Sequence, residues 1–367
     1  MKILNRYIAR SFLGSYAILI LLGVGLYILF DLMANMDEFT KNPDDSGTRV
    51  MWLMWDFYSH NIPLYYSQLG GPVMSFAAAY TLAMMLRKNE MVAMVAAGVR
   101  LHHFALPIIA SACLLIAIWV VNREFVIPAF AEKIARTKED VIGGRETGVA
   151  CAFDDRNAIL TASRFYPVEG RLGFVRIIAP DESGAPRYLI EADAAEWDAA
   201  RGTWRLERGR RYSNLAQESR PGVDTVGSVN APVPIDEYAF GLTPEQVVLR
   251  RGSQWGDLLS IRDLNVLRLS RHVPNRLAIE MSLHRRATEP IVQLVLLLLA
   301  IPFFLSRAPA NVLAGGGKAL LMSGVFFLFV FVSGSLVKDP GLAALFAWLP
   351  ILVFGPWAAA QLANVKT

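Results

Sequence analysis

Cysteine is scarce in this chain, with two in 367 residues. Cys113 falls inside an apolar run and Cys151 in a polar stretch, so we expect no disulfide between them, and no cysteine-rich metal motif is present. Lysine and arginine do not gather into a stripe of the kind that binds nucleic acid, and the formal net charge is only +4 at pH 7. These absences argue against a disulfide, a metal centre and a nucleic-acid partner.

Nucleotide-binding and catalytic motifs are lacking as well. Gly315–Lys318 has the ending of a phosphate-binding loop, but Val312 stands where the motif needs its first glycine, and Ala319 replaces its Ser or Thr. We therefore expect a turn there. His102 and His103 have no acidic or sulfur partner at ligand spacing, and no nucleophile pattern is present. The sequence predicts a protein that is not an enzyme, has no cofactor and relies on another chain for any ATP hydrolysis.

Long apolar runs are what the chain does have. With 54% hydrophobic and 19% charged residues, it is too apolar for one soluble domain and too charged for a pure membrane bundle. A helix of about twenty residues covers about 30 Å, the thickness of a hydrocarbon core. The first run is longer than the apolar part of a signal peptide, and no cleavage site follows it closely, so we expect it to be retained. The six predicted spans are Ser11–Met33, Ile62–Leu86, Phe104–Val121, Pro290–Leu305, Ala319–Val337 and Leu342–Leu362.

Residues 128–276 have a different character, with balanced charge and frequent turn signals. Several short alternating segments at close spacing predict a compact antiparallel sandwich or jelly roll. The expected strands are Asn157–Tyr166, Leu172–Ile178, Tyr188–Trp197 and Thr203–Leu206, and Trp255–Leu269 has a helical pattern. The predicted fold is a membrane helical bundle of six spans, three plus three, with an inserted all-β jellyroll-like domain. Residues 1–127 and 277–367 would be its two membrane halves, and residues 42–60 would be a polar and aromatic link.

The charges of the short loops predict the orientation. If the N-terminus is cytoplasmic, the inner side holds nine basic residues and the short outer links hold three. Cytoplasmic loops carry the excess of Lys and Arg, so we expect both termini inside and the insert outside. The nine are Lys2, Arg6, Arg10, Arg87, Lys88, Arg100, Arg307, Lys318 and Lys366, and the three are Lys41, Arg49 and Lys338.

Between the second and third spans, the segment from Arg87 to Arg100 has charged ends and an apolar centre. This pattern predicts an interfacial helix near residues 88–98, with Glu90 and the basic residues in water. Small residues in it would let another protein surface approach the backbone, so the segment fits a contact with a cytoplasmic motor. A simple re-entry turn between two spans is the alternative. The residues that share one face of the helix are Met91, Met94, Val95 and Gly98.

Four basic residues lie near the predicted outer boundary of the membrane: Lys41, Arg285, Arg286 and Lys338. Ionisable groups at the ends of spans usually snorkel to the interface. The alternative is that these four face an internal cavity and contact an anionic lipid headgroup, to which Arg offers forked donors and Lys a point charge.

Taken in order along the chain, short motifs resemble the lipopolysaccharide-export permeases of the LptF/LptG type, also called the YjgP/YjgQ family. The resemblance covers nearly the whole chain. It rests on Asn5–Arg10, Asn89-Glu90 leading to Ala97-Gly98, Pro107, Asn122, Val126–Pro128, Arg285-Arg286 with Pro290, and Ile301–Phe303.

The resemblance implies a multi-pass protein of the bacterial inner membrane with a periplasmic insert. Two such subunits would pair around a central cavity, and a cytoplasmic ATPase dimer would drive them through the helix after span two, with Glu90 as the acidic contact. Lipopolysaccharide would enter between spans one and five, which act as lateral gates, and pass to periplasmic bridge proteins at the jellyroll. In one respect this chain departs from some members: the outer end of span one carries Asp31, Asp37 and Glu38 with only Lys41, which puts phosphate binding there in doubt or shifts it to a partner subunit.

As a mechanism, we expect closure of the ATPase dimer to push the segment around Glu90, tilt the first three spans and narrow an apolar cavity lined by Phe326, Phe327 and Phe331. Two other classes stay open. A lipoprotein-releasing or division-associated permease also borrows an ATPase, but usually places its large domain after the first of four spans. A non-transport scaffold would use the external domain only to dock partners.

Overall fold

The computed structural model describes twelve stretches of the chain. They are residues 2–39, 47–135, 148–153, 158–166, 169–180, 186–213, 232–244, 246–247, 255–269, 276–305, 312–337 and 339–364. These residues form two compact units. A helical unit comprises Met1–Ala34, Asn61–Pro128 and Leu277–Thr367, and a second unit comprises Asn35–His60 and Ala129–Arg276. The second unit thus includes Asn35–His60, which the sequence analysis assigns to the N-terminal membrane half.

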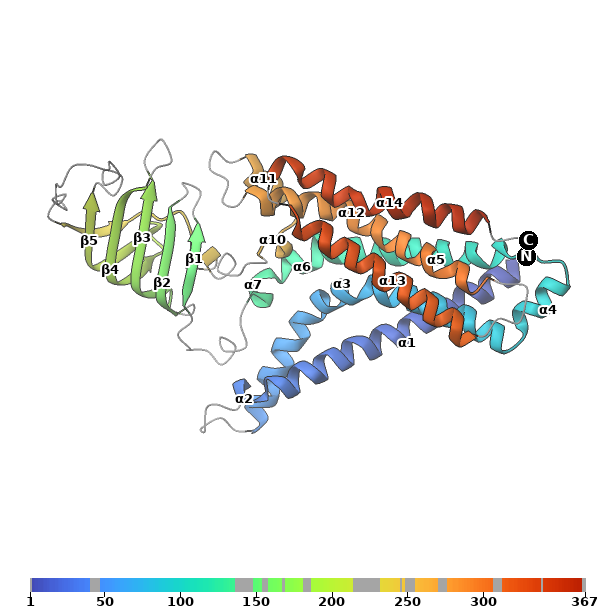
Figure 1. The fold of residues 1–367 in the computed structure, drawn as a ribbon. Coiled ribbons are helices and arrows are strands. Elements are labelled where there is room, and N and C mark those ends of the chain that lie inside the picture. Colours follow the sequence, from blue (N-terminus) through green and yellow to red (C-terminus); the bar gives the residue numbers. More distant parts are fainter. Residues whose placement is uncertain are drawn as a thin grey trace. The chain divides into compact units, whose positions relative to one another are not determined.

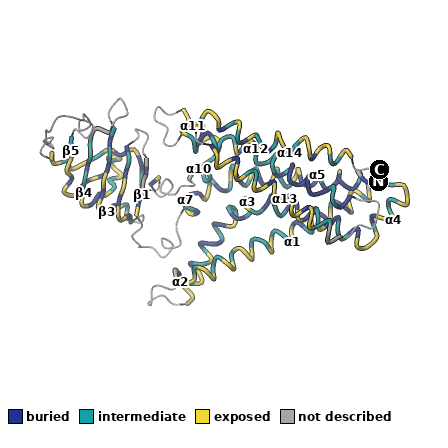
Figure 2. The backbone as a smooth tube through the Cα atoms, viewed as in Figure 1, coloured by how far each residue is buried: buried dark blue, intermediate teal, exposed yellow. Residues whose placement is uncertain are grey.

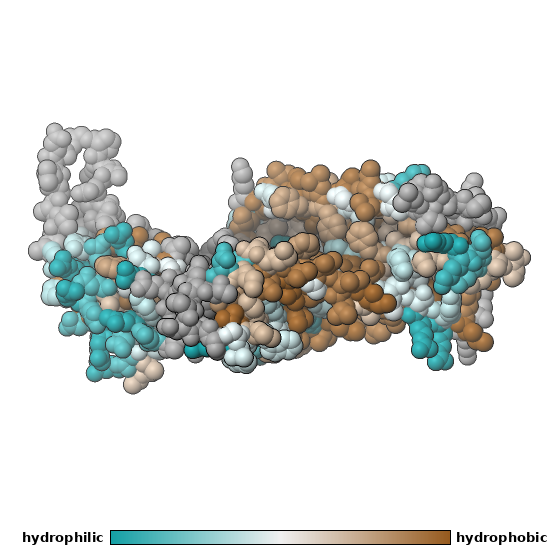
Figure 3. Space-filling model, turned by 90° about the horizontal axis from the view of Figure 1, so that it is seen from below, coloured by the Kyte–Doolittle hydropathy of each residue, from teal (hydrophilic) through white to brown (hydrophobic). Residues whose placement is uncertain are grey.

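Long helices build the helical unit (Figure 1). Its elements are α1 (Lys2–Ala34), α3 (Gly47–Arg87, from Asn61 on), α4 (Glu90–Ala96), α5 (His102–Val121), the π-helix η1 (Asn122–Val126), α6 (Ile127–Ala129, to Pro128), α12 (Arg276–Ala300, from Leu277 on), the 3-10 turn η3 (Ile301–Phe303), α13 (Val312–Ser335), the 3-10 turn η4 (Pro340–Leu342) and α14 (Ala343–Ala363). Among the described residues, six helices are long and apolar enough to cross a membrane, as the sequence predicts. On the face in view in Figure 3, hydrophobic residues cover most of the middle of this unit.

Five of the six apolar helices are longer than the apolar runs that predict them, and α14 has the same length as its run. Helix α3 begins at Gly47, so the prediction of a link over residues 42–60 is wrong for residues 47–60. Helix α12 begins at Arg276, well before Pro290, and its first turns carry charged residues. Apolar length marks only the lipid-facing part of a helix, because polar residues continue the same backbone geometry when they have water or partners.

The glycine run Gly315–Gly317 lies inside α13, so the expected turn is wrong. A Cβ added at Gly315 would stand 3.2 Å from the backbone oxygen of Phe303. Glycine therefore permits a close approach of two backbones here, which is its other common use besides turns.

Two buried clusters hold the helical unit together, and Figure 2 shows its buried backbone along α3, α5 and α12. One cluster joins α1, α3, α4, α5, α12, η3 and the start of α13, and the other joins α12, α13 and α14. At Gly71 of α3, an added Cβ would stand 2.8 Å from Cγ of Gln293 in α12, so these helices pack at a distance that only glycine allows. In contrast, the most apolar stretch of α1 is not buried within the chain.

The second unit contains one antiparallel sheet. Within the described residues this sheet has six strands, which pair with their sequence neighbours in the order β1-β2-β3-β4-β5-β6. The strands are β1 (Val149–Phe153), β2 (Ile159–Tyr166), β3 (Arg171–Pro180), β4 (Pro186–Asp198), β5 (Thr203–Ser213) and β6 (Val233–Tyr238). Short helices accompany the sheet: α2 (Met36–Phe39), α7 (Ala131–Ile134), α10 (Trp255–Leu258) and α11 (Ile261–Leu269).

The four strands that the sequence predicts are all present, and β1 and β6 are additional. Alternate residues build part of the core of the sheet, as in β2, where Leu160 and Ala162 are buried, and the buried Phe165 then breaks the alternation by one residue. Trp204 is 1% exposed, and its indole N–H donates to the backbone oxygen of Leu242 at 2.9 Å. A jelly roll also requires pairing between strands that are not neighbours in sequence. The described strands include no such pairing, so the jellyroll topology stays a prediction.

Candidate functional site

Helix α4 is a short helix between two longer ones, as the charge pattern predicts. It runs from Glu90 to Ala96 between α3 and α5. Left-handed residues flank it on both sides, since Asn89 has φ 59° and Gly98 has φ +88°. Asn and Gly are the residues that adopt this conformation most readily, so local sequence chemistry sets both bends. The segment is therefore a helix of defined length and not a simple turn.

One side of α4 is anchored in the helical unit. Met91 is 1% exposed and belongs to the same buried cluster as Ile8 and Phe12 of α1. Met94 and Val95 are partly buried against this cluster. The opposite side is open to solvent, and its exposed residues are Val92, Ala93, Ala96 and Ala97.

The predicted contact residues of this segment therefore have different surroundings. Glu90 is half-buried, Met94 is half-buried and Met91 is buried, whereas Gly98 is exposed. Met91 packs inward, and the outward face belongs to Val92 and the alanines. The helical period predicts that Met91 and Met94 share one face, but it does not predict whether that face packs against a partner or against the chain's own core.

Glu90 has a partner from a distant part of the sequence. The hydroxyl of Tyr7, in the second turn of α1, donates a hydrogen bond to Oε2 of Glu90 at 2.9 Å. No sequence pattern identifies Tyr7 as a site residue, because only a long-range contact brings its hydroxyl to Glu90.

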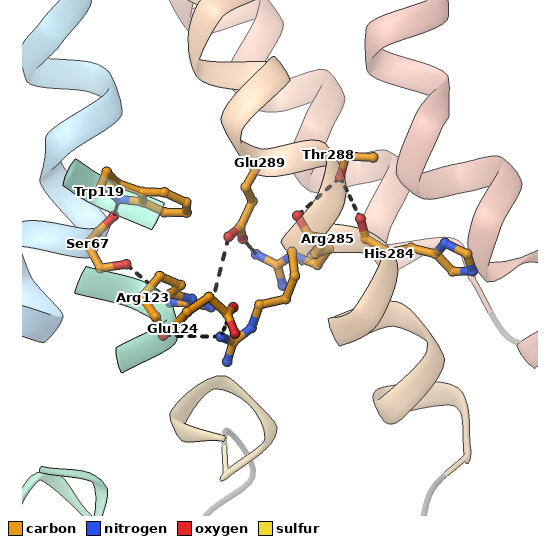
Figure 4. Close-up of polar contacts among 9 residues, drawn as sticks. Ser67, Trp119, Arg123, Glu124, His284, Arg285, Thr288 and Glu289 are labelled. Atoms are coloured by element: carbon orange, nitrogen blue, oxygen red, sulfur yellow. Dashed lines mark hydrogen bonds and ion pairs between the residues drawn. The ribbon is translucent and has the colours of Figure 1, made fainter. Parts of the chain in front are cut away.

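A second group of polar side chains lies where η1, α3 and α12 meet (Figure 4). Arg286 Nη1 meets Glu124 Oε1 at 2.7 Å, and the side chains are 2% and 16% exposed. The same nitrogen donates to the backbone oxygen of Arg123 at 3.2 Å. A guanidinium bonded to both a carboxylate and a carbonyl is the arrangement that makes a buried charge tolerable.

The group continues through Arg123 and Glu289. Arg123 Nη1 donates to Ser67 Oγ at 3.2 Å, and Arg123 Nη2 lies 4.0 Å from Glu289 Oε2, an ion pair longer than a hydrogen bond. Arg285, with its side chain 57% exposed, reaches Glu289 Oε1 at 3.5 Å. Three arginines and two glutamates of η1 and α12 thus lie together, and Ser67 of α3 joins them.

The π-helix η1 is tied to α3 by side chains before and within it. Trp119 donates to the backbone oxygen of Ser67 and Asn122 to that of Pro63, both at 2.9 Å. The wider π turn at Asn122–Val126 presents Arg123 to α3 and Glu124 to α12. Single π turns often occur at functional positions of a helix.

Of the four basic residues predicted to contact a headgroup, the structure describes two, Arg285 and Arg286, so the group as a whole stays a prediction. Arg285 and Arg286 are adjacent on α12, but one side chain is exposed and the other is buried against Glu124. Snorkelling is therefore wrong for Arg286. Lys41 and Lys338 lie outside the described residues.

The three predicted cavity phenylalanines point to different surroundings as well. Phe326 is 0% exposed and packs edge-on against Phe354 of α14, with ring centroids 5.1 Å apart. Phe327 and Phe331, one helical turn apart, are 40% and 72% exposed. Only the last two share an open face of α13.

Comparison with known proteins identifies one sequence family. Its model, described as "Lipopolysaccharide export system permease LptF/LptG", matches residues 6–363. A search of the curated proteins finds no significant match.

Proposed function

The chain belongs to the LptF/LptG family of lipopolysaccharide export system permeases, and on that premise we propose that it is the permease subunit of an ABC-type transporter that extracts lipopolysaccharide from the inner membrane and passes it to a periplasmic bridge. The observation that carries the proposal is the family match over residues 6–363, essentially the whole chain. Six apolar helices and a separate sheet are the parts that such a permease needs.

The position of the sheet favours this class over a lipoprotein-releasing or division-associated permease. All six described strands lie between the third and the fourth apolar helix, and not after the first of four. In this proposal the sheet unit is periplasmic, both termini are cytoplasmic, and ATP is hydrolysed by a separate ATPase dimer.

Helix α4 is the proposed contact to that ATPase. Its open face consists of small and medium apolar residues beside the carboxylate of Glu90. A carboxylate at the first turn of a helix next to such a face suits a partner that offers one cation and a shallow apolar groove. The buried side of α4 would then transmit the motion to the bundle.

Different roles are proposed for the two arginines of α12, because their surroundings differ. Arg285, exposed and held by a single ion pair, is the proposed cation for a lipid phosphate, with Lys41 and Lys338 as further candidates. Arg286 is proposed to hold η1 to α12 through Glu124. Phe327 and Phe331 are proposed to face lipid acyl chains or a second permease subunit, because both are open on this chain.

Charge reversal at Glu90 tests the coupling part of the proposal. Because a like charge opposite a partner's cation is strongly unfavourable, we expect Glu90→Lys to lower copurification of the ATPase subunit and lipopolysaccharide release by about tenfold or more. Membrane insertion and yield should stay normal. Glu191→Lys, a reversal of an exposed charge on the sheet, is the matched control for ATPase copurification. Normal copurification and release by Glu90→Lys would remove α4 as the coupling contact.

A further inference from the structure

Tyr7 and Glu90 are 83 positions apart, yet the tyrosine hydroxyl donates to the carboxylate at 2.9 Å. Tyr7 belongs to α1, whose most apolar stretch is not buried within the chain, and Glu90 begins α4. The bond therefore joins the start of a loosely packed span to the start of the helix that we propose as the ATPase contact.

A buried cluster joins the same two helices next to this bond. Met91 follows Glu90 directly, Ile8 follows Tyr7 directly, and both side chains are buried in one cluster. Ile8 is 0% exposed and Met91 1% exposed. Close-packed side chains transmit displacement because they leave no room for one to move alone.

From these observations we infer that Tyr7 is a positioning residue for Glu90, and that a push on α4 reaches α1 through the Tyr7–Glu90 hydrogen bond and the buried cluster that includes Met91 and Ile8. The inference rests on the proposed function, because it assumes that an ATPase subunit contacts Glu90. Beyond the proposed function, it assigns to Tyr7 the orientation of the Glu90 carboxylate and to α1 the movement that α4 passes on.

The chemistry of the pair suits this role. A hydrogen bond to an ionised carboxylate is stronger than one between neutral groups, and it restricts the rotamers of a glutamate that would otherwise lose entropy when a partner binds. A carboxylate has about four acceptor sites on its two oxygens, so one bond from Tyr7 leaves capacity for a partner's cation. Tyr7 thus orders Glu90 without occupying it.

The test uses the full chain with its copurified ATPase subunit and lipopolysaccharide in proteoliposomes. Tyr7→Phe removes only the hydroxyl. We expect the amount of lipopolysaccharide released per ATP hydrolysed to fall by about two- to fivefold, the factor that corresponds to one partly exposed hydrogen bond. Tyr80→Phe is the matched control, since Tyr80 is 53% exposed against 45% for Tyr7, and it should leave this ratio unchanged.

A double-variant cycle separates positioning from a purely structural role. In a Glu90→Ala background, which lacks the acceptor oxygens, the Tyr7→Phe change should have less effect than in the native chain, because the two variants remove the same interaction. The unfolding temperature of Tyr7→Phe should match that of Tyr80→Phe. Additive effects, or a lowered unfolding temperature that accounts for the loss, would overturn the inference.

Failure of the inference is distinguishable from failure of the proposed function. If Glu90→Lys abolishes release while Tyr7→Phe keeps the native ratio, Glu90 is a coupling contact and Tyr7 does not position it. If Glu90→Lys itself releases lipopolysaccharide normally, the coupling contact on which the inference rests is wrong.

Discussion

Two adjacent arginines, Arg285 and Arg286, have opposite environments because neighbouring residues of a helix point about 100° apart. The Arg285 side chain is 57% exposed, whereas that of Arg286 is 2% exposed and bonded to Glu124. The same residue type therefore has two physical roles at consecutive positions. Arg285 reaches water and could exchange Glu289 for another anion. Arg286 cannot leave Glu124 without depriving a mostly buried carboxylate of its cation.

Removal of these two side chains should have very different effects on stability. Arg286→Ala leaves Glu124 without its closest cation, so we expect a loss of about 3–5 kcal/mol of unfolding free energy. Arg285→Ala removes an exposed pair and should cost about 0–1 kcal/mol. Unfolding of the purified chain in detergent measures both. Removing both charges, in Arg286→Met with Glu124→Gln, should recover part of the loss, and equal losses for the two single variants would contradict this division.

For single residues, the sequence predicts which side chains carry a useful charge better than it predicts which residues they contact. Charge and small size point to Glu90 and to the arginines of α12, and the structure places Glu90 at the start of a real helix. Tyr7 and the Arg123–Glu289 ion pair could not be predicted, because each depends on a contact between residues far apart in the chain. Met91 shows the same limit, since its amphipathic pattern is equally compatible with a partner's surface or with the chain's own core.

At the scale of elements, α4 is defined by its two ends. Asn89 and Gly98 both have positive φ, and a Cβ added at Gly98 would meet nothing within 4 Å. Glycine is therefore needed at 98 for backbone conformation and not to relieve crowding within the chain.

Substitutions at Gly98 distinguish a role of this glycine in the backbone conformation from a role in close approach of the ATPase. We expect Gly98→Asn to keep ATPase copurification near native, because Asn adopts the left-handed region at a cost of a few tenths of a kcal/mol above Gly. Gly98→Val should reduce it, because a β-branched residue costs about 1–2 kcal/mol or more there. If Gly98 instead serves close approach of the ATPase, the larger Asn should be as harmful as Val.

The helix boundaries show why the length of an apolar run alone does not predict the length of a helix. Gly47–His60 and Arg276–Glu289 are helical although they carry several charges, because helix continuation needs only backbone hydrogen bonds and a tolerable environment for each side chain. Strands β2 to β5 were predictable, since alternation and turn residues agree there. Strands β1 and β6 lie at the edges of the sheet, where each has one pairing neighbour and the alternating pattern is weak.

At the scale of the whole molecule, order along the chain carries most of the information. Three apolar helices, a sheet and three further apolar helices follow one another, and the family match extends over residues 6–363. Composition and periodicity predict this order because each membrane span must satisfy its backbone internally and each strand must pair. How the helices of one half meet those of the other depends on single positions such as Gly71 and Arg286, and no sequence pattern predicts which residues these two positions contact.

The orientation of the chain is the whole-molecule prediction on which the export route depends. In a background of Cys113→Ser and Cys151→Ser, single cysteines at Val266 of α11, 64% exposed, and at the exposed Ala97 beside α4 report the two sides. With nine basic residues on the predicted inner side against three on the short outer links, we expect a membrane-impermeant maleimide to label Val266→Cys in cells with a permeabilised outer membrane. Ala97→Cys should react only after the inner membrane is opened. The reverse pattern would put α4 outside, where no ATPase can reach it, and protection of both positions until lysis would place the sheet in the cytoplasm and leave lipopolysaccharide without a periplasmic path.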